Sequence, residues 1–316
     1  MKTENKTNKK TKKKKVSIST IFLVLMFFTG LGIMLYPTIS DHWNSLRQSR
    51  AIANYEETVG TLDEKDYEAL FKDAELYNSH LRELSDPFAQ SDRLKDEYNH
   101  VLDVTGSGII GYVTISKIRV ELPIYHGTSE EVLNVAAGHL EGSSLPIGGK
   151  STHSVISAHR GLPSARLFTD LDEMEKGDTF TVTVLNRILT YEVDQIRIVE
   201  PDQIETLRVT EGMDYLTLQT CTPYGINSQR LLVRGHRVET APGTVVIHKD
   251  AIRIPAYIAA PAVAIPILFV LLLILLFVYR RKPAEITTAD IREMSKDENV
   301  QENIRDKKKK DRRLRR

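Results

Sequence analysis

Residues 214–239 read DYLTLQTCTPYGINSQRLLVRGHRVE and contain two short runs that are rich in Leu, Val and Thr. Polar and apolar residues alternate in much of both runs, which is typical of a β-strand with one buried face. The segment between the runs contains a proline, a glycine and an asparagine, so it is predicted to be a turn. This stretch therefore indicates two neighbouring strands of a β-rich domain.

Runs of the same kind extend upstream as far as residue 109, separated by clusters of Gly, Pro and Ser. They are, in chain order, IIGYVTI (109–115), IRVELPI (118–124), HSVISAH (153–159), TFTVTV (179–184) and LTYEVDQIRIV (189–199). Strands at this density, with little helix between them, predict a closed or nearly closed β-barrel over residues 109–240. Residues 162–174 are expected to form a short helix or a loop within it.

The region before the barrel, residues 37–108, is predicted to be helical. In residues 62–81 large apolar side chains recur every three or four positions, as in an amphipathic helix that packs on a domain. The pattern ends near Pro87, because the Asp86–Pro87 pair favours a turn. Residues 91–103 are suited to a further short helix.

Two runs of the sequence contain no charged residue. Residues 16–36 are long enough to cross a hydrocarbon core of roughly 30 Å as a helix. A cleavable signal peptide is the alternative, although the run exceeds a typical signal-peptide core and no small-residue cleavage site follows it. Residues 254–279 predict a second transmembrane helix, whose prolines a membrane helix tolerates.

The formal net charge of +1 is an average over very unlike parts. Residues 1–15 contain eight lysines and one glutamate (+7), and residues 280–316 contain fourteen basic and eight acidic residues (+6), which leaves −12 for residues 37–253. Positive residues beside membrane spans favour the cytoplasmic side. We therefore expect a multi-pass protein of the cell membrane, in contact with the lipid bilayer. Both tails would be cytoplasmic, the acidic domain extracellular, and residues 241–253 a linker.

The composition excludes several classes of protein. An acidic central segment argues against a nucleic-acid ligand, which requires clustered Lys and Arg. A single cysteine excludes an internal disulfide framework and a zinc site built from several cysteines. No cofactor and no metal are expected, because the histidines lack a ligand-like spacing and the acidic residues of 170–178 lack the order of a calcium-binding loop.

Three polar residues lie at the ends of predicted strands. Cys221 ends one run, His159 ends another, and Arg230 opens the strand that follows the Cys221 turn. A thiolate is the nucleophile of cysteine chemistry, so His159 would activate the thiol and supply a proton to a departing amine. Arg230 offers a charged donor for an oxyanion or a peptide backbone. A buried structural cysteine, a turn histidine and a solvated arginine are the alternatives.

The same residues carry a resemblance to the sortase family. Five segments resemble motifs of sortases, and four of them lie in the barrel region: GHLEGSSLPIGG (138–149), SAHRGLPSA (157–165), TLQTC (217–221) and TPYGINSQRLLVRGHR (222–237). TLQTC matches the signature TLxTC with Cys221 in the nucleophile position. The fifth, LSDPFAQS (84–91), resembles the lid of the pilin-polymerising class C sortases. The resemblance covers roughly residues 40–240.

This resemblance implies a sortase-type β-barrel and a membrane-anchored cysteine transpeptidase of a Gram-positive cell. Cys221 would attack the Thr–Gly bond of an LPxTG-like sorting signal and form an acyl-thioester. His159 would act as acid and base, Arg230 would stabilise the oxyanion or position the peptide, and Thr220 is assigned to substrate binding. In pilin-polymerising members the acceptor is a lysine amine of another pilin. The alternatives are a sortase that attaches surface proteins to a peptidoglycan precursor and a catalytically silent barrel that binds surface proteins.

The resemblance also implies a lid made of Asp86, Pro87 and Phe88. Asp86 would face Arg230, and Phe88, where some relatives have tryptophan, would cover Cys221. Opening of this segment would expose both groups to substrate.

Overall fold

The structure of the protein is a computed structural model. It describes residues 18–89 and 91–240, together with residues 265, 268, 269, 271–273 and 305. Apart from these few, the linker, the second predicted span and both charged tails lie outside the described residues, so the second transmembrane helix stays a prediction. The barrel lies within the compact unit Met26–Arg253.

Eight strands form a closed barrel in the order β1-β2-β3-β4-β7-β8-β6-β5. The strands are β1 (Ile109–Ile115), β2 (Val120–His126), β3 (Ala137–His139), β4 (Thr152–Ser157), β5 (Thr179–Val184), β6 (Arg187–Val199), β7 (Asp214–Thr222) and β8 (Gln229–Val238). The pairs β2–β3 and β4–β7 are parallel, and the other pairs are antiparallel. The prediction of a closed β-barrel is confirmed.

Alternation along β7 separates an inner face from an outer face. Leu216 and Leu218 are fully buried and belong to the main apolar core, as does Val233 of β8. Successive side chains of a strand point to opposite faces, so Gln219 and Cys221 lie on the outer side of the barrel. The candidate catalytic residue Cys221 therefore lies on the outer face of the sheet formed by β4, β7 and β8.

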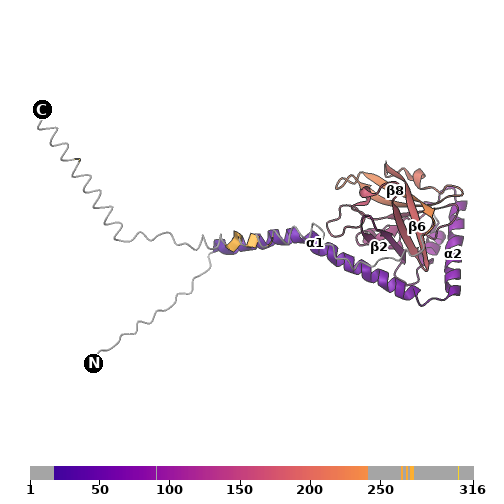
Figure 1. Ribbon diagram of the computed structural model, residues 1–316, viewed down its shortest axis with the longest axis horizontal. Coiled ribbons are helices and arrows are strands. Elements are labelled where there is room, and N and C mark those ends of the chain that lie inside the picture. The colour runs from indigo at the N-terminus through magenta and orange to yellow at the C-terminus, as the bar shows by residue number, and fades with distance from the viewer. Residues whose placement is uncertain are drawn as a thin grey trace, which may run out of the picture. The chain divides into compact units, whose positions relative to one another are not determined.

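Helices and short turns complete the fold. The helices are α1 (Ile18–Val59), α2 (Glu64–Glu83), α3 (Asp92–His100) and α4 (Glu130–Leu133), and the 3-10 turns are η1 (Leu171–Glu173) and η2 (Ile204–Leu207). Figure 1 shows α2 beside the barrel. Asp63 and Asp66 form a capping box that starts α2, and its buried residues Phe71 and Tyr77 share the core of the barrel. The predicted N-terminal helical region is thus present.

Helix α1 is longer than the predicted span of residues 16–36. It runs without interruption through Pro37 to Val59, because a proline costs a helix one backbone hydrogen bond without always ending it. Among the described residues, α1 is the one helix that is long and apolar enough to cross a membrane. The protein does not bury the most apolar part of α1. Its final turns carry Ile52 and Tyr55, which are buried in the core of the barrel.

Tyr55 links α1 to the barrel through two hydrogen bonds. Its hydroxyl donates to the Ile110 carbonyl (3.1 Å) and accepts from the Leu185 N–H (2.8 Å). We expect Tyr55→Phe to lower the free energy of unfolding by about 1–3 kcal/mol, because both backbone groups lose a buried partner. Urea denaturation of the full-length protein in detergent measures this. Thr58→Ala, on the exposed side of α1, should change it by less than about 0.5 kcal/mol. A Tyr55→Phe variant as stable as the wild type would contradict this role of the hydroxyl.

Candidate active site

Strand register brings the three predicted residues into one row on the outer face. Cys221 of β7 lies directly opposite Arg230 of β8. On the other side β4 runs parallel to β7, with Ser157 opposite Gln219. His159, two residues beyond Ser157, therefore reaches the level of Cys221, two residues beyond Gln219. Neighbouring strands are about 4.8 Å apart, so this register brings the three backbone positions close together on the outer face.

Two hydrogen bonds fix the chain ends that carry His159 and Cys221. The Ala158 N–H donates to the Gln219 carbonyl (3.1 Å), and the Thr220 hydroxyl donates to the Ala158 carbonyl (2.8 Å). Thr220 is buried, and the hydrogen bond of its hydroxyl links β7 to the end of β4. A direct contact between Thr220 and substrate stays a prediction.

The three side chains are neither buried nor fully exposed. The guanidinium of Arg230 donates to the carbonyls of Gln229 (3.1 Å) and Asn227 (3.4 Å). In the described part of the chain it has no carboxylate partner, so its charge is available to a bound group. A reachable thiol, an imidazole and an unpaired guanidinium in one row are suited to acyl transfer from a peptide.

Arg160 is part of this site, although the sequence analysis did not single it out. Its side chain is only 10% exposed, and it forms an ion pair with Asp172. It also donates to the hydroxyl of Thr222, the residue after Cys221 (3.3 Å). Arg160 thus connects the chain beside His159 to the end of β7. No sequence pattern indicates this, because the partners are brought together only by the fold.

The lid segment lies over the same outer face. Phe88 packs against an apolar cluster formed by Val155 of β4, Leu207 of η2 and Leu232 of β8. Gly142 makes room for it, since a Cβ atom at this position would lie 2.7 Å from the Phe88 ring and from the Pro87 carbonyl oxygen. The ring of Phe88 therefore covers the apolar part of this outer face, at the level of residues two to four positions before Cys221 in β7.

The polar contacts of the lid differ from the expected arrangement. The carboxylate of Asp86 accepts the N–H of Phe88 (3.2 Å), and no ion pair joins it to Arg230 in the part of the chain that the structure describes. An exposed carboxylate gains little from pairing, because water solvates it well. The lid is instead contacted from the opposite side, where Arg208 donates to the Ser85 carbonyl (3.4 Å). Covering of Cys221 itself by Phe88 stays a prediction.

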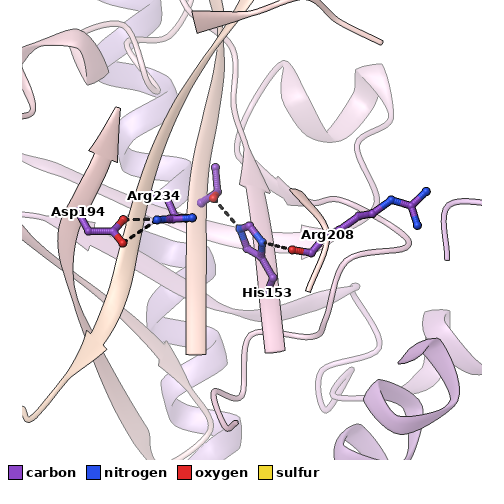
Figure 2. A network of polar contacts seen from close by, with 5 residues as sticks. His153, Asp194, Arg208 and Arg234 are labelled. Carbon is purple, nitrogen blue, oxygen red and sulfur yellow. Dashed lines mark hydrogen bonds and ion pairs between the residues drawn. The ribbon is translucent and has the colours of Figure 1, made fainter. Parts of the chain in front are cut away.

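A network of polar contacts surrounds His153 on the outer face of the barrel (Figure 2). His153 Nδ1 donates to the Arg208 carbonyl (3.0 Å), which can only accept, so Nε2 accepts from the Thr217 hydroxyl (2.8 Å). Beside it, Arg234 forms a bidentate ion pair with Asp194 (2.8 and 3.0 Å). Burial lowers the pKa of His153 to about 4, so the ring is neutral at physiological pH. The network thus fixes the loop that carries Arg208 against β4.

Other candidate residues lie away from the row of Cys221. His139 is buried in β3, and burial lowers its pKa to about 4. Within residues 18–89 and 91–240, and the few described beyond them, no group of three His, Cys, Asp or Glu side chains is arranged to hold a metal ion. Asp172, which the sequence placed in an acidic loop, pairs with Arg160.

The two buried histidines predict a pH dependence of stability. His139 and His153 are neutral in the folded protein down to about pH 4 but bind a proton near pH 6.5 when unfolded. The free energy of unfolding should therefore fall as the pH drops from about 6.5 to about 4, by on the order of 3 kcal/mol per histidine. Denaturant titrations at a series of pH values measure this. His153→Gln should reduce the slope, whereas His100→Gln, on an exposed side chain, should not. An unchanged slope in His153→Gln would refute the assignment.

Comparison with known proteins identifies the family. The family model described as "Sortase domain" matches residues 113–238. A crystal structure of sortase C1 from Streptococcus agalactiae is 51% identical with a TM-score of 0.59, and the match covers 60% of this chain and 99% of that one. The sortase C structure from Streptococcus pneumoniae is 46% identical with a TM-score of 0.53, covering 61% of this chain and 99% of that one.

A curated relative, sortase A of Streptococcus agalactiae serotype III, is 32% identical over 117 residues, which is 36% of this chain and 47% of that protein. The match thus covers about half the length of that curated relative. It covers almost the whole length of the two sortase C structures. A closed barrel with a half-buried cysteine at the end of β7 is the arrangement that the sequence analysis predicted for a cysteine transpeptidase. The chain belongs to the sortase family.

Proposed function

We propose that this protein is a membrane-anchored class C sortase that joins pilin subunits on a Gram-positive cell. The observation that carries the proposal is the strand register that brings His159, Cys221 and Arg230 to one level, on the outer face where the ring of Phe88 packs. The similarity to sortase C1 and sortase C structures supports the class. The substrate would be a pilin or surface protein with an LPxTG-like sorting signal.

The row of residues is suited to two successive acyl transfers. The Cys221 thiolate attacks the threonine carbonyl of the sorting signal, and the Thr–Gly bond breaks as His159 gives a proton to the glycine amine. Arg230 donates to the oxyanion that forms at the carbonyl. A lysine amine of a second pilin then attacks the thioester, loses a proton to His159 and releases the Cys221 thiolate.

We further propose that the acidic domain faces outward and that both termini are cytoplasmic. Support comes from the +7 and +6 charges of the tails beside two apolar runs. Helix α1 would anchor the domain at the outer surface, where sorting signals emerge.

The catalytic assignment predicts a trapped intermediate. Incubation of the full-length protein with an LPxTG peptide should give a mass increase at Cys221 that corresponds to the acyl-thioester. Cys221→Ala should give none, and His159→Ala should slow turnover by about 10²–10⁴-fold, since a positioned acid and base is removed. Arg230→Ala should slow it by about 10²–10³-fold through loss of an oxyanion donor. His100→Ala, on an exposed helix end, serves as the control.

In cells, lysine-linked pilin ladders should disappear with Cys221→Ala. Wall-anchored monomers without ladders in the wild type would favour a sortase that uses a peptidoglycan precursor. Absence of any thioester, even when the lid is altered, would point to a catalytically silent barrel.

The lid assignment predicts faster access to Cys221 when its contacts are removed. Asp86→Ala combined with Phe88→Ala should raise the rate of thiol labelling about tenfold, because loss of a half-buried ring withdraws roughly 1.5 kcal/mol from the closed state. Stopped-flow measurement with a thiol reagent gives this rate. Leu76→Ala, an exposed residue of α2, is the matched control. Unchanged labelling kinetics in the double variant would count against a lid.

A further inference from the structure

A cavity of about 550 Å³ adjoins the lid, and its wall includes residues from α2, the lid and the loop between β6 and β7. Pro87 and Phe88 line one side, and His153 of β4 lines another. His153 of β4 precedes His159, which lies two residues beyond the end of β4, by six residues, and this corresponds to about 20 Å of extended chain. The cavity therefore lies at the end of the groove that is remote from Cys221.

Three cationic side chains line this cavity against one anionic side chain. Arg82 comes from the end of α2, Lys150 from the segment before β4, and Arg208 from the loop between β6 and β7, while Glu211 is the only carboxylate. The cavity thus carries a net charge of +2, although residues 37–253 carry −12 overall. A cationic cavity in an acidic domain is a local feature that selects an anionic ligand.

The three cationic side chains form only long polar contacts, or no ion pair, with the described part of the protein. Arg82 donates to the Ser151 carbonyl at 3.4 Å, and Arg208 lies 3.8 Å from the carboxylate of Glu205. Lys150 is exposed and has no carboxylate partner within residues 18–89 and 91–240. These side chains can turn toward a bound carboxylate without breaking a strong ion pair.

The length of an extended peptide bound at Cys221 can be compared with the distance from Cys221 to the cavity. A peptide whose threonine is bonded to Cys221 has its leucine three residues earlier, which is about 10 Å along β7 when the peptide is extended. This distance brings the leucine between the level of Gln219, opposite Leu232, and that of Thr217, opposite Val155, and the ring of Phe88 packs on Leu232 and Val155. Residues that precede the sorting signal would continue into the cavity. In the opposite direction residues 223–228 are all exposed, so the chain offers no comparable wall there.

We propose that this cavity is a binding site for acidic residues immediately upstream of the sorting signal. Arg82, Lys150 and Arg208 contact the acidic side chains, and Glu211 opposes them. The inference rests on the proposed function, because it takes the peptide to be the substrate of Cys221. It gives the enzyme a means to choose among proteins that share one sorting signal.

The test compares three peptides that differ only in the two residues before the sorting signal, which are Glu-Glu, Gln-Gln or Lys-Lys. Binding to full-length Cys221→Ala protein in nonionic detergent is measured by fluorescence anisotropy, with and without Phe88→Ala to free the groove. The Glu-Glu peptide should bind about fivefold more tightly than Gln-Gln, and Lys-Lys more weakly than either. The difference should fade in 0.5 M salt, since screening acts on exposed charges.

Variants locate the effect in the cavity. Lys150→Glu and Arg82→Glu should each abolish the preference for the acidic peptide, whereas Glu211→Gln should increase it. Lys176→Glu changes the net charge equally on an exposed residue outside the cavity and should leave the preference intact. A preference that survives Lys150→Glu combined with Arg82→Glu would overturn the location.

Thioester formation on the wild-type protein separates this inference from the proposed function. Equal affinity for the Glu-Glu and Gln-Gln peptides, with a thioester on both, overturns the acidic site and leaves the transpeptidase intact. Failure of every peptide to bind and to acylate Cys221, in both lid backgrounds, overturns both.

Discussion

The pairing register of β7 with β4 and β8 is the constraint on which the site depends. It sets Cys221 opposite Arg230 and brings His159 to the same level. A slip of one residue would turn Cys221 into the barrel, among the leucines that now fill it. The hydrogen bonds of Ala158 with Gln219 and Thr220 hold this register at the end of the strands where Cys221 lies. Strand pairing therefore also sets the geometry of the proposed site.

The outer face of these strands is unusual for a barrel because it is partly apolar. Val155 and Leu232 alternate with polar residues and would form an exposed apolar patch if Phe88 did not cover them. Such patches generally mark binding sites. Under the proposed function, the lid segment and an extended peptide would compete for this surface. Gly142 is required there because any side chain at that position would meet the lid backbone.

Charge is distributed in a way that the net value conceals. The domain is acidic as a whole, yet the groove carries cationic groups at both ends, with Arg230 beside Cys221 and Lys150 at the distal cavity. Elsewhere Arg160 is paired with Asp172 and Arg234 with Asp194. Arg230 and Lys150 have no close carboxylate partner among the described residues and are thus available to a ligand. Both lie on the line along β7 that the proposed peptide substrate would follow.

The sequence by itself determined the closed barrel, the helical region before it and the three residues of the proposed site. Alternation, turn residues and short motifs are local, so each can be recognised from neighbouring residues alone. The tertiary structure decided that α1 continues through Pro37, that the Asp86 carboxylate accepts the N–H of Phe88 instead of pairing with Arg230, and that Arg160 joins the candidate site. It also decided that His153 holds the loop of Arg208. These contacts join residues far apart in the chain or depend on packing, and no local pattern encodes them.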